Sequence, residues 1–234
     1  MCDVVAAALR ARCDEAGFDI VHPFRIAWFN DTVEPSLRIP DWGRQSALGF
    51  VVGNTRRLWS VFARRAAEDR SVLGVENPLD SYVEKALTNA ASRSIDDRHV
   101  ILFAHHMTPV PVAIQRVAHA SGLAHLSPSR LSVHPTYGPW LALRAVIVVD
   151  ADGPTGDRPF LHDPCTPCPK PCLAAFDRAL AATEMGRPGD VERQWESWAD
   201  VREVCPEGRA FRYGDDQLRY HYTKDRSILR LLLR

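Results

Sequence analysis

The run LALRAVIVV, residues 141–149, is the strongest constraint on the fold of this chain. A short, almost continuous apolar run rich in β-branched residues is typical of a buried strand, here expected near 140–149. Segments 46–54 and 98–106, SALGFVVGN and RHVILFAHH, predict two more strands. Residues 18–30 are expected to be extended, and residues 131–134 predict a further short strand.

Helical patterns lie between and after these strands. The first amphipathic segment ends at Gly17. Asn77 and Pro78 supply the cap and first residue of a later helix, and Gly122 ends another. This mixed order predicts an α+β fold with a central, mainly antiparallel sheet flanked by helices. Beyond the first, helices are expected near 55–69, 77–94, 111–122, 173–185 and 190–204, with two short ones over 215–234.

The chain divides by composition into three parts. Residues 1–150 hold the predicted strands and form the expected core. Residues 151–189 are a proline- and cysteine-rich insertion with one helix, and its first part holds six prolines, which cannot join a strand ladder. Residues 190–234 are expected to be helices that complete the core.

Charge and hydropathy exclude two classes of partner. The formal net charge is zero, whereas a nucleic-acid surface usually needs a basic excess, so no nucleic-acid partner is expected. No apolar run reaches 18 residues, so no membrane partner is expected. The N-terminal segment lacks the charge order of a signal peptide, which predicts a cytoplasmic protein.

The cysteines are unevenly placed, which indicates metal or redox chemistry rather than a disulfide framework. Three of the six are bunched in the spacing H-x2-C-x2-C-x3-C, which matches a ferredoxin run with histidine in the first position. Either an iron–sulfur cluster or a zinc ion fits thiolates at this spacing. A thiol that donates electrons or acts as a nucleophile, or a loop with incidental cysteines, are the alternatives. The candidate metal ligands are His162, Cys165, Cys168 and Cys172, with Cys205 as a replacement for His162.

Five segments, in order, resemble the methylmalonic aciduria and homocystinuria type C family of cobalamin-processing proteins. The resemblance covers residues 17 to about 150, is poor over 151–190, and returns near the C-terminus. It implies a fold like that of the flavin nitroreductases, epoxyqueuosine reductase and reductive dehalogenases. It also implies binding of base-off cobalamin and removal of its upper ligand, by reductive decyanation or by alkyl transfer to a thiol. The segments are GFDIVHPFRIAWFN, NPLDSYVEKAL, VAHASGLAHL, VHPTYGPWLALRAVIV and YGDDQLRYHYTKDRSILRLLL.

The resemblance implies a role for the turn HPTYGPW, residues 134–140. Tyr137 and Trp140 offer apolar faces, and Gly138 allows a backbone to approach closely. Two prolines fix the turn. It is either a rigid shelf for a corrin ring or a turn before a strand whose aromatic rings fill the core.

The resemblance also assigns individual residues. His119 is expected at the upper face of cobalt, and Arg144 and Arg202 match arginines of the family's glutathione site. An arginine inside an apolar strand is costly unless an anion pairs with it, so Arg144 is unusual without any family argument. The position of a third arginine of the family's glutathione site falls on Ile228 in this sequence. A thiol other than glutathione, or another acidic partner, is therefore also compatible with the two matching arginines. The expected corrin contacts are His119, Ser129, Ser132, His134, Tyr137, Gly138 and Trp140.

Two alternatives remain at this stage. A flavin-dependent oxidoreductase of nitroreductase type would bind FMN, although the sequence has no dedicated phosphate motif. A non-catalytic carrier would bind cobalamin and pass it to an accepting protein. An enzyme would in addition need a small thiol or a reductase as electron donor.

Overall fold

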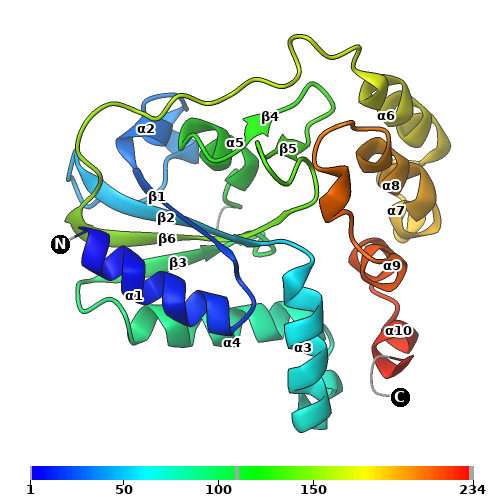
Figure 1. Ribbon diagram of the computed structural model, residues 1–234, viewed down its shortest axis with the longest axis horizontal. Coiled ribbons are helices and arrows are strands. Elements are labelled where there is room, and N and C mark those ends of the chain that lie inside the picture. The colour runs from blue at the N-terminus through cyan, green and yellow to red at the C-terminus, as the bar shows by residue number, and fades with distance from the viewer. Residues whose placement is uncertain (1, 109–110, 232–234) are drawn as a thin grey trace.

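Four antiparallel strands form the central sheet of the computed structural model, which describes residues 2–108 and 111–231 (Figure 1). Their spatial order is β1-β2-β6-β3, so the two longest strands, β2 and β6, lie in the middle. A separate two-stranded hairpin is formed by β4 and β5. The strands are β1 (Ile20–Arg25), β2 (Ala47–Asn54), β3 (His99–Phe103), β4 (His125–Leu126), β5 (Ser132–Val133) and β6 (Ala142–Asp152).

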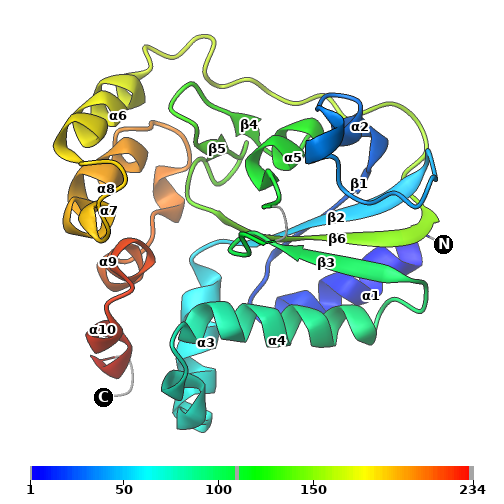
Figure 2. The same cartoon turned by 180° about the vertical axis from the view of Figure 1, so that it is seen from behind.

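Helices cover both faces of this sheet (Figures 1 and 2). On one face α1, α3 and α4 pack, and on the other face α2, α5 and the β4–β5 hairpin. The helices are α1 (Cys2–Glu15), α2 (Ala27–Asn30), α3 (Arg57–Glu68), α4 (Pro78–Ser92), α5 (Ile114–Ala120), α6 (Pro171–Ala182), α7 (Asp190–Arg193), α8 (Trp195–Glu203), α9 (Asp215–Thr223) and α10 (Arg226–Leu231), with short 3-10 helices at Pro35–Leu37, Arg70–Gly74 and Arg209–Phe211.

Strand β6 is buried on both faces because its side chains alternate between two apolar clusters. Ile147 packs with α1, α3 and α4, whereas Val148 packs with α2 and α5. Burial on both sides explains why the sequence of β6 is apolar throughout rather than alternating. The predicted α+β class with a mainly antiparallel sheet flanked by helices is thereby confirmed.

The C-terminal helices lie beside the sheet and also complete its core. Residues 153–170 run as a long loop past α2 and α5 before reaching α6 (Figure 1). Helices α6 and α8 pack on each other, while Tyr220, Ile228 and Leu229 join the core under the sheet. The end of the tail predicted as two helices, residues 232–234, lies outside the described residues.

Two predicted elements differ from the structure. The segment 18–30 forms β1 only over Ile20–Arg25 and then turns into α2. Pro23 is tolerated in β1 because β1 lies at the edge of the sheet. One side of an edge strand has no neighbouring strand, so a residue without an N–H group on that side loses no hydrogen bond. The single helix predicted over 190–204 is broken at Gln194 into α7 and α8.

Candidate functional site

The segment 134–140 forms a tight turn immediately before β6. His134 and Gly138 exchange two backbone hydrogen bonds, each 2.9 Å long. Nδ1 of His134 accepts the backbone N–H groups of Thr136 and Tyr137, at 3.0 and 3.3 Å. The rings of His134 and Tyr137 stack with centroids 4.6 Å apart. The turn is therefore held rigid by its own backbone and side chains.

Gly138 and Trp140 face the protein itself rather than a free surface. Trp140 is 1% exposed and packs against α8 and α9. Gly138 has a φ of +55°, and an added Cβ atom would overlap the carbonyl oxygen of Glu207. Of the expected shelf, only Tyr137 keeps a partly exposed ring. The turn thus anchors the C-terminal helices and presents a single aromatic ring.

Burial of His134 makes the stability of the protein sensitive to acid. Burial lowers the pKa of His134 to about 4, from an ordinary 6.5. Between these two values the unfolded chain binds a proton that the folded chain does not, so stability falls as the pH falls from about 6.5 toward about 4. In His134→Asn the side-chain oxygen can accept the same N–H groups without titrating. We expect urea unfolding at several pH values to show a shallower acid decline for this variant, and an unchanged decline would contradict the assignment.

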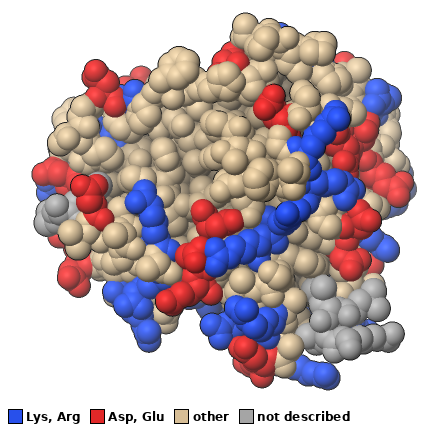
Figure 3. All heavy atoms as spheres, in the orientation of Figure 1, with Lys and Arg blue, Asp and Glu red and all other residues tan. Residues whose placement is uncertain are grey.

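A cleft of about 250 Å³ opens beside the turn, between α5, β5, the start of β6 and α8. Ser132 lines it, and its buried hydroxyl has no hydrogen-bond partner within the described residues. Gln115 of α5 and Arg202 of α8 line the same cleft. On the side seen in Figure 3, the middle of the molecular surface carries few charges and is bordered by a row of basic side chains.

His119 lies one helical turn after Gln115 on α5, so the two side chains share a face of that helix. Its Nδ1 atom accepts the backbone N–H of Leu126 at 3.2 Å, and its ring meets the ring of His125 edge-on at 5.5 Å. Burial lowers the pKa of His119. A neutral imidazole whose Nδ1 accepts carries its proton on Nε2, so His119 can donate a hydrogen bond from that atom.

Arg144 is buried in β6, and no carboxylate of the described residues is its partner. Its side chain is 8% exposed, and Nε donates to Oδ1 of Asn54 at 2.7 Å. One terminal nitrogen of the guanidinium has no partner among the described residues. A buried cation with an unused donor is costly, which makes it a candidate to bind an anion.

Three more unused polar groups lie in the same region. Arg202 has an unpartnered Nε, Tyr213 an unpartnered hydroxyl and His221 an unpartnered Nε2, counting partners within the described residues. The ring of Tyr213 contacts the ring of His221 at 5.3 Å. Burial raises the pKa of Tyr213 and lowers that of His221 well below its ordinary value, so both are neutral at pH 7. The site therefore combines two cations with neutral polar groups and suits a carboxylate or a similar anion.

Tyr213 and His221 were not predicted from the sequence. Both belong to the C-terminal segment, whose many polar and charged residues are typical of the protein surface. The sequence offered only a weak signal, the apolar and aromatic residues near His221, namely Leu218, Tyr220 and Tyr222. The burial of the helix face with Gln217 and Tyr220 is known from the structure alone. Arg144 and Arg202, which were predicted, come together here from β6 and α8.

The bunched cysteines line a second cavity, separate from the cleft. Cys205, which follows α8, lies at the same cavity, whereas His162 is exposed and is not among its lining residues. Burial raises the pKa of Cys165 to about 11 and also raises that of Cys205. Thiols with raised pKa values carry little thiolate at neutral pH, which disfavours a free nucleophilic thiol at this place. The cysteines of the cavity are Cys165, Cys168, Cys172 and Cys205.

Leu131 lines both the cleft and the cysteine cavity, so it is a point at which the two are adjacent. Some of the expected corrin contacts lie at the cleft and others at the cysteine cavity. Ser132 is at the cleft, whereas Ser129 is at the cysteine cavity and bonds to Ser127 at 3.0 Å.

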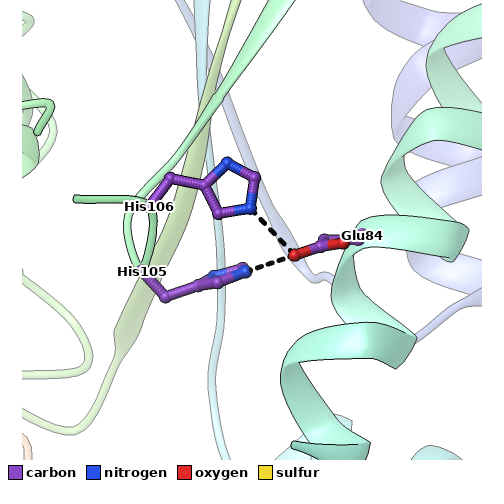
Figure 4. A group of neighbouring side chains, drawn as sticks. All are labelled: Glu84, His105 and His106. Atoms are coloured by element: carbon purple, nitrogen blue, oxygen red, sulfur yellow. Dashed lines mark hydrogen bonds and ion pairs between the residues drawn. The ribbon is translucent and has the colours of Figure 1, made fainter. Parts of the chain in front are cut away.

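A further cluster, which the sequence did not suggest, joins α4 to the loop after β3 (Figure 4). His105 Nε2 and His106 Nε2 both lie within hydrogen-bond distance of one oxygen of Glu84, at 2.7 and 2.9 Å. These two contacts lower the pKa of Glu84. One carboxylate oxygen thus bonds to Nε2 of both imidazoles, and the group is explained as a hydrogen-bonded anchor that ties the loop to α4.

Comparison with known proteins identifies the family. The model of the methylmalonic aciduria and homocystinuria type C family matches residues 17–232. The chain belongs to that family. The match includes residues 151–190, where the sequence resemblance was weakest.

Curated relatives and a solved structure agree with this membership. The chain is 22% identical to a cyanocobalamin reductase / alkylcobalamin dealkylase of Gallus gallus, over 97% of this chain and 95% of the relative. It is 23% identical to a human protein of the same name, over 92% of this chain and 76% of that protein. A C. elegans B12-trafficking protein, CblC, has a similar structure, with a TM-score of 0.71 at 18% identity and coverage of 99% and 96%. This likeness confirms the fold, while the relation to nitroreductases stays a prediction.

No helix in the described part of the chain is long and apolar enough to cross a membrane.

Proposed function

We propose that this chain binds cobalamin base-off and removes its upper axial ligand, with a thiol or an electron donor as co-substrate. The observation that carries the proposal is the cleft of about 250 Å³ with Arg202 on its wall, together with the unpartnered donor of the buried Arg144, whose neighbour Leu143 lines the same cleft. The names of the curated relatives, all cyanocobalamin reductases / alkylcobalamin dealkylases, support this choice of substrate.

The cleft and its rim have the chemistry that a corrinoid requires. A corrin has apolar faces and a rim of amides, so it needs apolar walls with a few polar groups. Leu141 and Leu143 supply apolar wall, while Ser132 and Gln115 supply polar groups. In this geometry the cleft holds one edge of the ring, with Tyr137 at its border. His119 would donate from Nε2 to the upper ligand or the ring.

The two reactions differ in where the electrons come from. In decyanation, cobalt(III) gains one electron from the donor and cyanide leaves with its electron pair. In dealkylation, a thiolate sulfur attacks the alkyl carbon, a carbon–sulfur bond forms, and the pair of the cobalt–carbon bond stays on cobalt. The residues of the site contribute position and charge. Arg144 and Arg202 would hold the carboxylates of an acidic thiol such as glutathione.

A visible-light titration of the purified protein with cyanocobalamin tests the proposal. We expect a shift to the base-off spectrum, followed by growth of cob(II)alamin after a reductant is added. Gln115→Trp should weaken binding at least about tenfold, because Gln115 is exposed and lines the cleft, which a tryptophan side chain would fill. Arg116→Trp, one residue on and also exposed, is the matched control and should bind normally.

The outcomes separate the alternatives. The absence of any spectral shift, in both the wild type and the control, would contradict cobalamin binding, and FMN would then be titrated in the same way. A base-off shift without cob(II)alamin formation would favour the carrier, a role that the trafficking name of the C. elegans protein supports. A cobalamin-accepting protein would then be the expected partner.

A further inference from the structure

Four cysteines from two distant parts of the chain meet at one cavity. Two of them lie in the loop before α6, one in the first turn of α6, and one directly after α8. The packing of α6 on α8 brings these parts together, through contacts that include Cys172 and Val201. Cys13, the remaining cysteine whose side chain is described, lies apart from them in the core under the sheet. Incidental cysteines would not be expected to gather in this way.

The backbone around these thiols has the form expected of metal ligands. Cys168 and Cys205 are each followed by proline, which has no N–H, so the next amide is free to turn back to the sulfur. The N–H of Lys170 donates to Sγ of Cys168 at 3.3 Å. Glu207, two residues after Cys205, lines the same cavity. Backbone hydrogen bonds to ligand sulfurs orient the thiolates and are typical of metal–thiolate centres.

The separation of the thiols favours a cluster over a single ion. Within the described residues, no three of the four sulfurs lie within 4.8 Å of one another, although Sγ of Cys165 lies within that distance of a ligand atom of His125 and of Asp163. A tetrahedral zinc ion with bonds of about 2.3 Å would hold its sulfurs about 3.8 Å apart. An iron–sulfur cluster places several atoms between its ligands and so holds them farther apart.

We propose that this cavity binds an iron–sulfur cluster through the thiolates of Cys165, Cys168, Cys172 and Cys205. His162 is not a ligand, because it is exposed and outside the cavity. The fourth ligand comes instead from the segment after α8, so the cluster also ties the loop to the C-terminal helices.

The position of the cavity gives the cluster a role, and this step rests on the proposed function. Leu131 lines both the cysteine cavity and the cleft. A cluster here would lie close to a corrin bound in the cleft. The reduced cluster would pass one electron to cobalt(III), cyanide would leave with its electron pair, and a low-potential one-electron carrier protein would reduce the cluster again.

Anaerobic purification and reconstitution with ferrous iron and sulfide test the site without any cobalamin. We expect brown absorbance and equal amounts of iron and acid-labile sulfide, about two or about four of each per chain, since four cysteines hold either cluster type. Electron paramagnetic resonance should show the reduced cluster after dithionite. One zinc per chain with no iron or sulfide, or no metal at all, would overturn the proposal.

Single variants identify the ligands. Cys205→Ser should lose most of the bound iron, whereas His162→Ala and Cys13→Ser should retain it. Full iron binding by Cys205→Ser, or loss in His162→Ala, would overturn the ligand assignment. If Cys205→Ser fails to fold, the iron and sulfide content of the wild type and of His162→Ala still decides the site.

A second readout separates the cluster from the function. Pre-reduced protein, freed of dithionite, should convert one cyanocobalamin to cob(II)alamin per cluster. If the cluster forms and cyanocobalamin shows the base-off shift but is not reduced, the site stands and the electron path is wrong. If the cluster forms and no base-off shift occurs, the proposed function fails independently of the site.

Discussion

Gly138→Ala should lower the free energy of unfolding by about 3–5 kcal/mol, the largest effect on stability that we expect from a single methyl group. Gly138 has a φ of +55°, which costs an alanine about 1–2 kcal/mol. Its Cβ position also coincides with the backbone of Glu207, which cannot move aside as a flexible side chain could. Chemical denaturation monitored by circular dichroism would measure the change.

The substitution Gly138→Ala should also displace residues outside the turn. Glu207 lies two residues after Cys205 and lines the same cavity, so displacing the 207–208 backbone also displaces a proposed cluster ligand. Gly208 faces Tyr137 reciprocally, with a φ of +65°, and Gly208→Ala should behave alike. Gly74→Ala is the control, because nothing lies within 4 Å of its Cβ position. Equal stability of Gly138→Ala and Gly74→Ala would show that the two loops do not pack as described.

The sheet could be predicted because its signal is local. All but the first residue of the apolar run 141–149 lies in β6, and the segments 46–54 and 98–106 contain β2 and β3. A short apolar run favours a buried strand over a buried helix when it is rich in β-branched residues and follows a turn that contains Gly and Pro, and both signals are local. The break between α7 and α8 is different, because Gln194 is not a helix breaker and only tertiary packing stops the helix there.

The site could be predicted only in part, because its residues depend on contacts between distant segments. The turn HPTYGPW predicts rigidity, but not whether its glycine faces a ligand or another loop. Trp140 has the same ambiguity, and the structure buries it. The spacing of residues 162–172 indicates a thiolate site, yet the choice between His162 and Cys205 depends on how α8 packs against α6.

Arg144→Met should separate anion binding from stability. We expect the concentration of glutathione needed for half-maximal dealkylation of methylcobalamin to rise about 100-fold, because a buried charged hydrogen-bond partner is lost. Stability should stay level or rise. Methionine fills a similar volume, and removing a buried, incompletely paired cation offsets the loss of its 2.7 Å bond to Asn54. Kinetics with varied thiol and a thermal unfolding curve provide the two measurements.

A thiol without carboxylates is the control for the effect of Arg144→Met on dealkylation. A neutral thiol such as 2-mercaptoethanol has no carboxylate for Arg144 to bind, so its dealkylation kinetics should be the same in Arg144→Met and in wild type. Arg178→Met removes an exposed arginine that pairs with Asp200, and it should change neither measurement. Equal losses with both thiols, together with lower stability, would make Arg144 a structural residue of β6. Loss with glutathione alone, at undiminished stability, would place the carboxylates of the co-substrate on this arginine.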